Sequence, residues 1–329
     1  MCGITGYVSY EEKTSIQSFY NAHLKIAHRG PDDEGFMIKV GNQYLPCTGK
    51  DSDESLNLPN ISSIKESQIV LGHRRLSIID LSSKGHQPYK FENLWLTYNG
   101  EIYNYIELRE ELIEKGYSFD SNSDTEVFIK GYHCWGDNVF EKLNGMWAAA
   151  IFNEHDESLI LTRDRFGIKP LYFSNLNQSL IFGSEIKFIA SFFKKLEVNE
   201  CAVIDYLSAC YIDHSSETFF KDIYQLKPGH ILRYDKYKNQ TIIPYWTISP
   251  TETSKENLDS LLTNAIKLRL ISDVEVGALL SGGLDSNLIV GKIFQENMKQ
   301  DFQTFSAVFD QEEFSEKKYI EATIKKTEF

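Results

Sequence analysis

Short apolar runs separated by turn residues dominate the first 246 residues. Helical spacing of apolar residues between Ile16 and Ala27 predicts one helix, and Asn104 with Glu107 resembles a capping box before a second. The expected strands are spaced too irregularly for repeating βαβ units, which favours antiparallel sheet in an α+β layered domain. They lie at residues 4–8, 76–79, 94–98, 148–152, 159–162 and 180–182.

Two polar, turn-rich segments interrupt this pattern. Residues 41–68 show no periodicity and predict a long surface loop. Residues 226–256 predict a last hairpin followed by a linker. A boundary near residue 250 therefore separates a first domain, residues 1–250, from a second, residues 251–329.

The second domain has a different order of elements. An amphipathic helix around Leu258 precedes an apolar strand at 274–280, the loop SGGLDS, a helix at 287–298 and a strand at 302–309. This order predicts the βαβ opening of a parallel sheet. Because two parallel strands cannot bury both of their faces, we expect this domain to be incomplete.

Composition narrows the class of protein. With 329 residues the chain is long enough for two domains, and its net charge of -13 would repel a nucleic acid. No apolar run reaches the ~18 residues of a membrane helix, and the first residues, MCGITGYVSYEEK, lack the basic and apolar regions typical of a signal peptide. We therefore expect a cytoplasmic protein without a membrane partner. Five scattered cysteines without a CxxC pair argue against a disulfide scaffold or a zinc site.

Cys2 differs from the other cysteines by its position behind the initiator Met1. Removal of the methionine leaves a thiol and a free α-amine on one residue, and an α-amine with a pKa of about 7.7 to 8.0 can accept the thiol proton. The nucleophile would then carry its own base. The Met-Cys pair alone, however, favours a simpler interpretation, namely a small residue in an N-terminal strand.

Asn99 and Gly100 form a second candidate pair. The amide of Asn99 and the backbone N–H of Gly100, where a strand ends and a helix is about to begin, can converge on one point as oxyanion donors. Asn-Gly is also a common hairpin turn, so the pair alone leaves both interpretations open.

Nine segments of the first domain follow one another in a recognisable order: MCGITGY at 1–7, AHRGPDDEGF at 27–36, LGHRRLSIIDLS at 71–82, GHQPY at 85–89, YNGEIYNYIELREEL at 98–112, SNSDTEV at 121–127, LNGMWAAAIFN at 143–153, RDRFGIKPLYF at 163–173 and GSEIKFI at 183–189. In these segments the sequence resembles the class II (N-terminal nucleophile, Ntn) glutamine amidotransferases, and within them the glutamine-hydrolysing asparagine synthetases. The fold expected from the resemblance is a four-layer αββα Ntn-hydrolase sandwich, followed by the beginning of an α/β PP-loop ATP pyrophosphatase domain.

The resemblance implies roles for the residues of the first domain. Cys2 is the nucleophile, and Asn99 and Gly100 stabilise the tetrahedral intermediate. Arg75 binds the α-carboxylate of glutamine, and Asp124, with Glu101 nearby, binds its α-ammonium. Simpler interpretations exist for two of these residues. Arg74 could take the place of Arg75, Arg75 could be a solvated charge on a strand, and Asp124 could be a helix cap inside a capping box of Ser123 and Glu126.

Basic residues near these motifs are interpreted as structural. Gly30 and Pro31 make a fixed turn, and we expect Arg29 to help hold Cys2 in place. Three histidines near these motifs, His28, His73 and His86, could suggest a Cys-His dyad. We interpret them as structural, because the terminal amine already supplies the base. Arg163, Asp164 and Arg165 are expected to form a turn network near a domain contact.

The loop SGGLDS predicts a second site. Consecutive backbone N–H groups, two serine hydroxyls and the N-terminus of the following helix make a pyrophosphate cradle, distinct from a Walker loop because no Gly-Lys-Ser/Thr follows. The resemblance implies ATP with Mg²⁺ as cofactors, Asp285 on the Mg²⁺ side, and Leu280 and Val308 beside the adenine. The expected ATP-binding residues are Leu280, Ser281, Gly282, Gly283, Asp285, Ser286 and Val308.

Together the two sites imply asparagine synthase chemistry. Ammonia from glutamine would pass to an adenylated aspartate and give asparagine, AMP and pyrophosphate. Three alternatives stay open: a related amidotransferase acting on a sugar-acid or peptide carboxylate, a truncated chain with glutaminase activity only, and a non-catalytic regulatory module. The resemblance also leaves open whether two chains associate as a homodimer.

Overall fold

The computed structural model describes residues 1–249, 257–298, 302–311, 313 and 315–327. The chain divides into two compact units, Met1–Ser249 and Pro250–Phe329. The linker predicted within residues 250–256 lies outside the described residues. In the part of the chain that is described, none of the helices combines the length and the apolar character needed to cross a bilayer.

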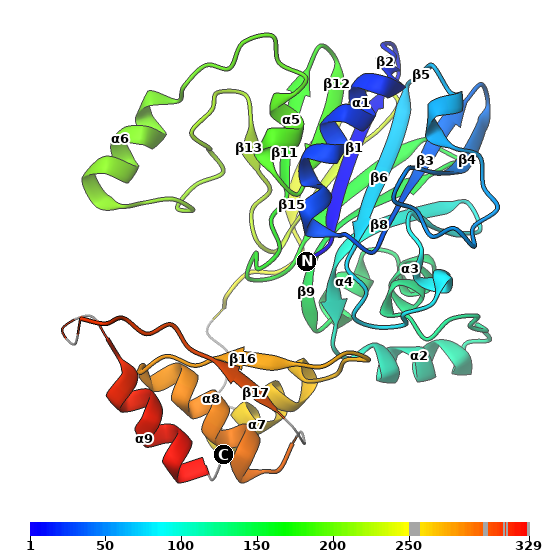
Figure 1. Cartoon of the computed structure of the whole chain (residues 1–329). Coiled ribbons are helices and arrows are strands. Elements are labelled where there is room, and N and C mark those ends of the chain that lie inside the picture. Colours follow the sequence, from blue (N-terminus) through cyan, green and yellow to red (C-terminus); the bar gives the residue numbers. More distant parts are fainter. Residues whose placement is uncertain (250–256, 299–301, 312, 314, 328–329) are drawn as a thin grey trace. The chain divides into compact units, whose positions relative to one another are not determined.

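Two antiparallel sheets form the centre of the first unit (Figure 1). One sheet has the order β13 (Tyr224–Gln225), β11 (Tyr172–Leu176), β12 (Ser179–Gly183), β1 (Gly3–Ser9), β6 (Ile69–Arg75), β3 (Asp33–Val40) and β4 (Gln43–Thr48). The other has the order β15 (Gln240–Pro244), β14 (His230–Tyr234), β10 (Ser158–Arg163), β9 (Gly145–Asn153), β8 (Leu94–Ile102) and β7 (Tyr89–Phe91). A small pair joins β2 (Thr14–Ser15) to β5 (Glu66–Ser67).

Helices cover the outer face of each sheet. The β1 sheet carries α1 (Ile16–His23), η1 (Leu24–Arg29) and α5 (Ile186–Ala190), and the β8 sheet carries α2 (Tyr105–Glu114), α3 (Asp124–Trp135) and α4 (Asn138–Lys142). The remaining helices of this unit are η2 (Ile61–Ser63), η3 (Ser83–Gly85) and α6 (Glu200–Ala209). Helix, sheet, sheet and helix make four layers, so the predicted αββα sandwich is confirmed.

Three apolar clusters separate these layers. Between the sheets lies a core with Val8, Trp95, Phe152 and Phe182, while Phe19 and Phe188 pack under α1 and α5, and Phe128 and Phe140 pack under α3 and α4. Every residue of β1 is buried because the strand is central in its sheet and covered on both faces. Gly6 in β1 leaves room for the ring of Phe182, which would lie 2.0 Å from a Cβ at that position.

Three local predictions were wrong. Residues 41–68 are not one loop, because β4 pairs with β3 and β5 pairs with β2. Residues 76–79 are not a strand, since β6 ends at Arg75 and the apolar side chains that follow line a pocket. Asn104 occupies the N-cap of α2 without capping it, because its side-chain oxygen accepts from the N–H of Asn144 instead.

The second unit contains a βαβ arrangement. Its elements are α7 (Leu258–Arg269), β16 (Gly277–Leu279), α8 (Leu284–Gln295), β17 (Gln303–Phe305) and α9 (Lys317–Thr327). The two strands are parallel, as predicted, with Ala278 opposite Thr304. The strand predicted at 274–280 is shorter than expected, and Leu279 is 82% exposed.

Candidate active site

Strand pairing in the β1 sheet fixes the position of Cys2. Cys2 immediately precedes β1, and the pairing of Gly3 with Arg74 brings it beside the end of β6. There the backbone N–H of Leu76 donates to the Cys2 Sγ at 3.3 Å, and the thiol donates to the Leu76 carbonyl at 3.5 Å. As expected, Arg29 also holds this residue: its Nε donates to the Cys2 carbonyl at 2.8 Å.

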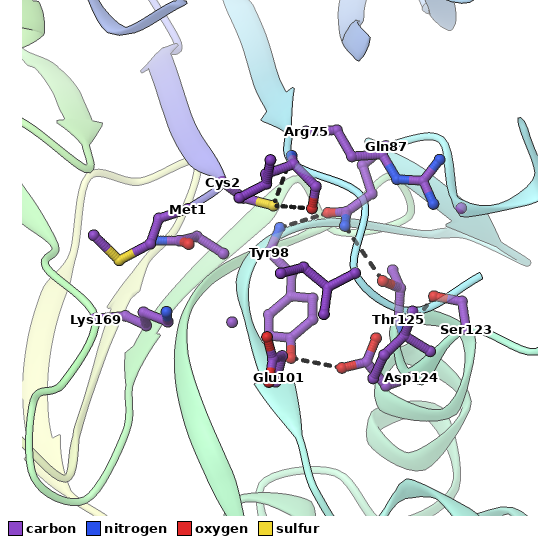
Figure 2. A pocket seen from close by; sticks show the side chains of 16 residues that line it. Met1, Cys2, Arg75, Gln87, Tyr98, Glu101, Ser123, Asp124, Thr125 and Lys169 are labelled. Atoms are coloured by element: carbon purple, nitrogen blue, oxygen red, sulfur yellow. Dashed lines mark hydrogen bonds between the residues drawn. The ribbon is translucent and has the colours of Figure 1, made fainter. Parts of the chain in front are cut away.

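A cavity of about 80 Å³ opens beside the Cys2 thiol (Figure 2). Its walls come from the end of β6 and the loop after it, from β8 of the opposite sheet, from the start of α3, and from the segment before β11. Every residue proposed for the glutaminase site lines it, namely Cys2, Arg75, Asn99, Gly100, Glu101 and Asp124. Elements far apart in the sequence are thus brought together as the resemblance implies.

Asn99 and Gly100 lie inside β8 and not at its end, because the strand continues to Ile102. A Cβ on Gly100 would lie 2.1 Å from the carbonyl oxygen of Met146 on the neighbouring strand, so only glycine fits. Asn99 is 1% exposed, and neither the nitrogen nor the oxygen of its amide has a partner among the described residues. A buried polar group without a hydrogen bond is costly, and here it faces a cavity.

Asp124 is the first residue of α3 and is buried against the cavity. Its Oδ2 accepts from the Tyr98 hydroxyl and from the backbone N–H of Ile102, both at 2.9 Å. Burial raises the pKa of Asp124, although these hydrogen bonds oppose the shift. The helix cap is Ser123, whose side chain accepts from the Thr125 N–H.

The capping box predicted around Asp124 is incomplete. Glu126 does not reach back to Ser123; instead its carboxylate accepts from the backbone and hydroxyl of Ser121 and pairs with Lys130 at 2.5 Å. Asp124 is therefore left to face the cavity while its neighbours secure the start of the helix.

Glu101 and Lys169, whose side chains can carry opposite charges, both line the cavity. Burial raises the pKa of Glu101, and burial lowers the pKa of Lys169, while each charge favours the ionised form of the other. Burial also raises the pKa of the Cys2 thiol, an effect that the positive charges of Lys169 and Arg75 oppose. The cavity is therefore a desolvated site in which charges act on one another strongly.

The two arginines at the end of β6 point into different environments. Arg74 is buried in an ion pair with Glu34 at 2.7 Å and does not line the cavity. Arg75 does line it, while its two terminal nitrogens donate to the carbonyls of Asp80 and Ser82, the second at 2.8 Å. Each of these nitrogens carries two hydrogens, so Arg75 retains donors for a ligand.

The three histidines have structural partners. His28 pairs with Glu185 and His86 with Asp33, at 2.8 Å and 2.7 Å. His73 contacts the Tyr98 carbonyl at 3.0 Å, and burial lowers its pKa to about 3, so the ring is neutral. The turn network is also present, because buried Asp164 accepts from the N–H groups of Phe166, Ile168 and Lys169.

The loop SGGLDS lies at the N-terminus of α8. Gly283 is the N-cap and makes no side-chain capping hydrogen bond. The hydroxyls of Ser281 and Ser286 are 2.9 Å apart, and the Gly282 N–H donates to the Glu316 carboxylate at 2.9 Å. The hydroxyls and the uncapped helix N-terminus suit a phosphate group.

The other residues predicted for the ATP site surround this loop unevenly. Leu280 is buried and donates its N–H to the Phe305 carbonyl at 2.9 Å, whereas Val308 is 53% exposed. Asp285 lies in the first turn of α8 and is exposed. Among the described residues no group of three or more His, Cys, Asp or Glu side chains could hold a metal ion.

Comparison with known proteins agrees with this geometry. Residues 60–246, more than half of the chain, match the family model of the glutamine amidotransferase domain. The chain belongs to the glutamine amidotransferase family. Residues 257–329 of this amidotransferase match the asparagine synthase family, which fits the start of a PP-loop domain in the second unit.

Individual relatives support the same assignment. The chain is 36% identical over 326 residues to asparagine synthetase [glutamine-hydrolyzing] 1 of Bacillus subtilis, covering 96% of this amidotransferase and 47% of the relative. It is 33% identical to putative asparagine synthetase [glutamine-hydrolyzing] 2 of Methanocaldococcus jannaschii, covering 98% and 62%. The chain thus spans about half to three fifths of the length of these relatives.

A solved structure shares the fold. Glutamine phosphoribosylpyrophosphate amidotransferase from B. subtilis, complexed with ADP and GMP, aligns with a TM-score of 0.56 at 18% identity. The alignment covers 94% of this chain and 67% of that one. This likeness confirms the Ntn-type fold of the first unit.

Sequence reasoning gave no role to several residues of the cavity. Lys169, Gln87 and Leu76 line it, and the Gln87 side chain accepts from the Tyr98 N–H at 2.7 Å. Nothing local marks these residues, because a lysine between turn residues is usually exposed. The apolar residues at 76–79 were a usable signal, but their pattern indicated a strand.

The Tyr98 hydrogen bond yields a stability test. Tyr98→Phe removes a donor from a buried carboxylate, so the free energy of unfolding at neutral pH should fall by about 1–3 kcal/mol. The hydrogen bond favours the charged form of Asp124. Its contribution to the free energy of unfolding is therefore present above the pKa of Asp124 and is lost as the pH falls through that pKa. Urea denaturation at neutral and acidic pH measures the difference. Tyr237→Phe, at a side chain 74% exposed, is the matched control, and an equal loss in both variants would contradict the assignment.

Proposed function

We propose that the first unit hydrolyses glutamine to glutamate and ammonia with Cys2 as the nucleophile. The observation that carries the proposal is the buried amide of Asn99, which has no partner among the described residues and lies in the same cavity as the thiol. A donor held without a partner in the free protein suits an oxyanion that forms only during reaction. Gly100 supplies the second donor to this position.

Removal of Met1 prepares the nucleophile. Met1 lines the cavity, so its loss enlarges the space beside Cys2 and moves the free α-amine onto the cysteine itself. The amine takes the thiol proton, the Sγ attacks the side-chain amide carbon of glutamine, and the amine returns the proton to the departing ammonia. Water then hydrolyses the thioester and releases glutamate.

The charged walls of the cavity would bind the two ends of the amino acid. Arg75 offers its remaining N–H donors to the α-carboxylate, and Asp124 with Glu101 accepts the α-ammonium. An ammonium ligand would offset the cost of keeping two carboxylates away from water, a cost visible in the raised pKa values of both groups. The glutamine backbone would thus be held while its side chain reaches Cys2.

For the second unit we propose ATP binding with Mg²⁺ at SGGLDS, as part of an asparagine synthase. Ser281, Gly282, Gly283 and Ser286 would hold phosphate oxygens, with Asp285 on the metal side. ATP supplies the adenylyl group that activates a carboxylate towards ammonia. Both named relatives are asparagine synthetases, which favours aspartate as acceptor and a carbon–nitrogen ligase that uses glutamine as amido donor. A sugar-acid or peptide acceptor is the alternative.

The nucleophile assignment predicts a simple result. The purified chain should release glutamate from glutamine, Cys2→Ala should reduce this rate to the background, and the variant should unfold at the same urea concentration as the parent. Intact mass should show that the active protein lacks Met1. Cys47→Ala, at a buried cysteine outside the cavity, is the control. Parent-like activity in Cys2→Ala, or an active protein that retains Met1, would overturn the mechanism.

The oxyanion assignment predicts an effect on turnover. Asn99→Ala should lower kcat by about 10²–10³-fold while KM stays near the parent value, because the amide binds only the developing charge. Since that amide has no partner to lose, the free energy of unfolding should fall less than for a hydrogen-bonded buried asparagine. Exposed Asn21→Ala should behave like the parent. A raised KM with unchanged kcat would instead assign Asn99 to substrate binding.

The acceptor is tested by pyrophosphate release from ATP in the presence of glutamine and a panel of carboxylates. Release that depends on aspartate, and that Ser286→Ala weakens, supports asparagine synthesis. Release that depends on a sugar acid or a peptide carboxylate favours the alternative acceptor. Glutamate formation without pyrophosphate release from any carboxylate leaves this chain a glutaminase only.

A further inference from the structure

Lys169 is a buried cation that the mechanism above does not use. It belongs to the segment between β10 and β11 and is 6% exposed. Its backbone is fixed in the turn, because its N–H donates to Asp164 Oδ2 at 3.0 Å and its carbonyl accepts from Arg163 Nε at 2.7 Å. Figure 2 shows the side chain extending from this turn into the cavity, on the same side as Met1.

The ammonium of Lys169 has neither a hydrogen bond nor an ion pair with any residue that the structure describes. A buried lysine is normally paired, since an isolated ammonium loses its hydration without compensation. The other buried lysine of this unit illustrates the usual arrangement: Lys130 is 4% exposed and pairs with Glu126 at 2.5 Å. A purely structural role for Lys169 would predict a comparable partner.

The charges around the nucleophile are mixed in sign. Arg29, on η1, and Arg75, at the end of β6, are cationic, while Asp32 precedes β3 and Glu101 and Asp124 come from β8 and α3. The Tyr98 hydroxyl is neutral, because burial raises its pKa well above the usual range. Of the cations, both arginines are bound by carbonyl groups, whereas Lys169 is held only by its turn.

Lys169 places a positive charge beside both groups that titrate in the proposed mechanism. With Met1 present, burial lowers the pKa of the amine on Met1 and the charges of Arg29 and Lys169 add to this effect. Removal of Met1 would transfer the amine to Cys2, which lines the same cavity as Lys169. The same charge favours the Cys2 thiolate against the raising effect of burial. Glu101 acts in the opposite direction on the amine, because a negative charge favours the ammonium form.

We propose that Lys169 is a positioning residue for glutamine hydrolysis, whose unpaired ammonium keeps the α-amine neutral and the thiol reactive at neutral pH. This inference rests on the proposed glutaminase function and adds to it a residue that sets the pH range of the nucleophile. Lys169 need not touch glutamine to do so, since it acts through the charge it places beside Cys2.

The test compares variants that change charge and shape separately. Lys169→Met keeps the length of the side chain and removes the charge, Lys169→Arg keeps the charge, and Lys13→Met removes a lysine that is 53% exposed and lies outside the cavity. For each, kcat/KM for glutamine is measured from about pH 5 to about pH 10. The rate of Cys2 alkylation by iodoacetamide, followed by peptide mass, is measured over the same range without substrate.

Removal of the charge raises the pKa of the amine and of the thiol, so the acidic limb of both profiles should move to higher pH in Lys169→Met. We expect a shift of about one pH unit, which is about tenfold in rate at a pH on that limb. Lys169→Arg and Lys13→Met should keep the parent profile. A parent-like profile in Lys169→Met, or an equal shift in Lys13→Met, would overturn the proposal.

Two further results separate the possible failures. If Lys169→Met does not fold, Glu101→Gln tests the electrostatic effect by removing a negative charge instead of a positive one. The acidic limb of the pH profile for Cys2 alkylation should then move to lower pH. An unshifted limb would contradict the proposal. If the parent chain does not hydrolyse glutamine, the proposed function fails, but alkylation still reports whether Lys169 controls the reactivity of Cys2. The two ideas can therefore be rejected independently.

Discussion

The face-to-face packing of the two antiparallel sheets is the constraint on which the candidate site depends. Cys2 belongs to one sheet, through the pairing of Gly3 with Arg74, and Asn99 belongs to the other, through the pairing of β8 with β9. The thiol and the amide can share one cavity only because the apolar core holds β1 and β8 close together. Gly6 contributes to this core from within the β1 sheet, because it leaves room for the ring of Phe182 on the paired strand β12.

Desolvation at the edge of this core gives the cavity its chemical character. Burial raises the pKa of Cys2, Glu101 and Asp124 and lowers the pKa of Lys169, so ionisation of each of these four groups carries a cost. Elsewhere in the unit the same cost is offset inside the protein, as in the buried pair of Arg74 and Glu34. In the cavity the charged side chains are only partly paired with one another. Such incomplete pairing is expected of a site that binds a zwitterionic ligand.

Site residues that stand in a recognisable sequence motif could be predicted from the sequence. Residues whose role depends on packing between distant segments could not. The motifs around Cys2, Asn99 and Asp124 could be found because each stands in a recognisable segment, and the cavity gathers all three. The β4 strand was missed because it is a short edge strand that contains Pro46, and its sequence QYLPCT shows no apolar period. Lys169 was given no role because the cavity that it lines is built with residues far away in the sequence, such as Cys2 and Arg75.

Carboxylates lie beside backbone N–H groups at the N-termini of two helices. Asp124 lies in the first turn of α3, where the helix dipole favours negative charge, and its carboxylate can in turn attract a cation such as an α-ammonium. At α8 the N-cap Gly283 offers no side chain, Asp285 lies in the first turn, and the Gly282 N–H of the preceding loop donates to the Glu316 carboxylate. On the proposed function, a phosphate oxygen would take the place of Glu316 at Gly282, whereas Asp124 stays at the start of α3 and binds the ligand itself.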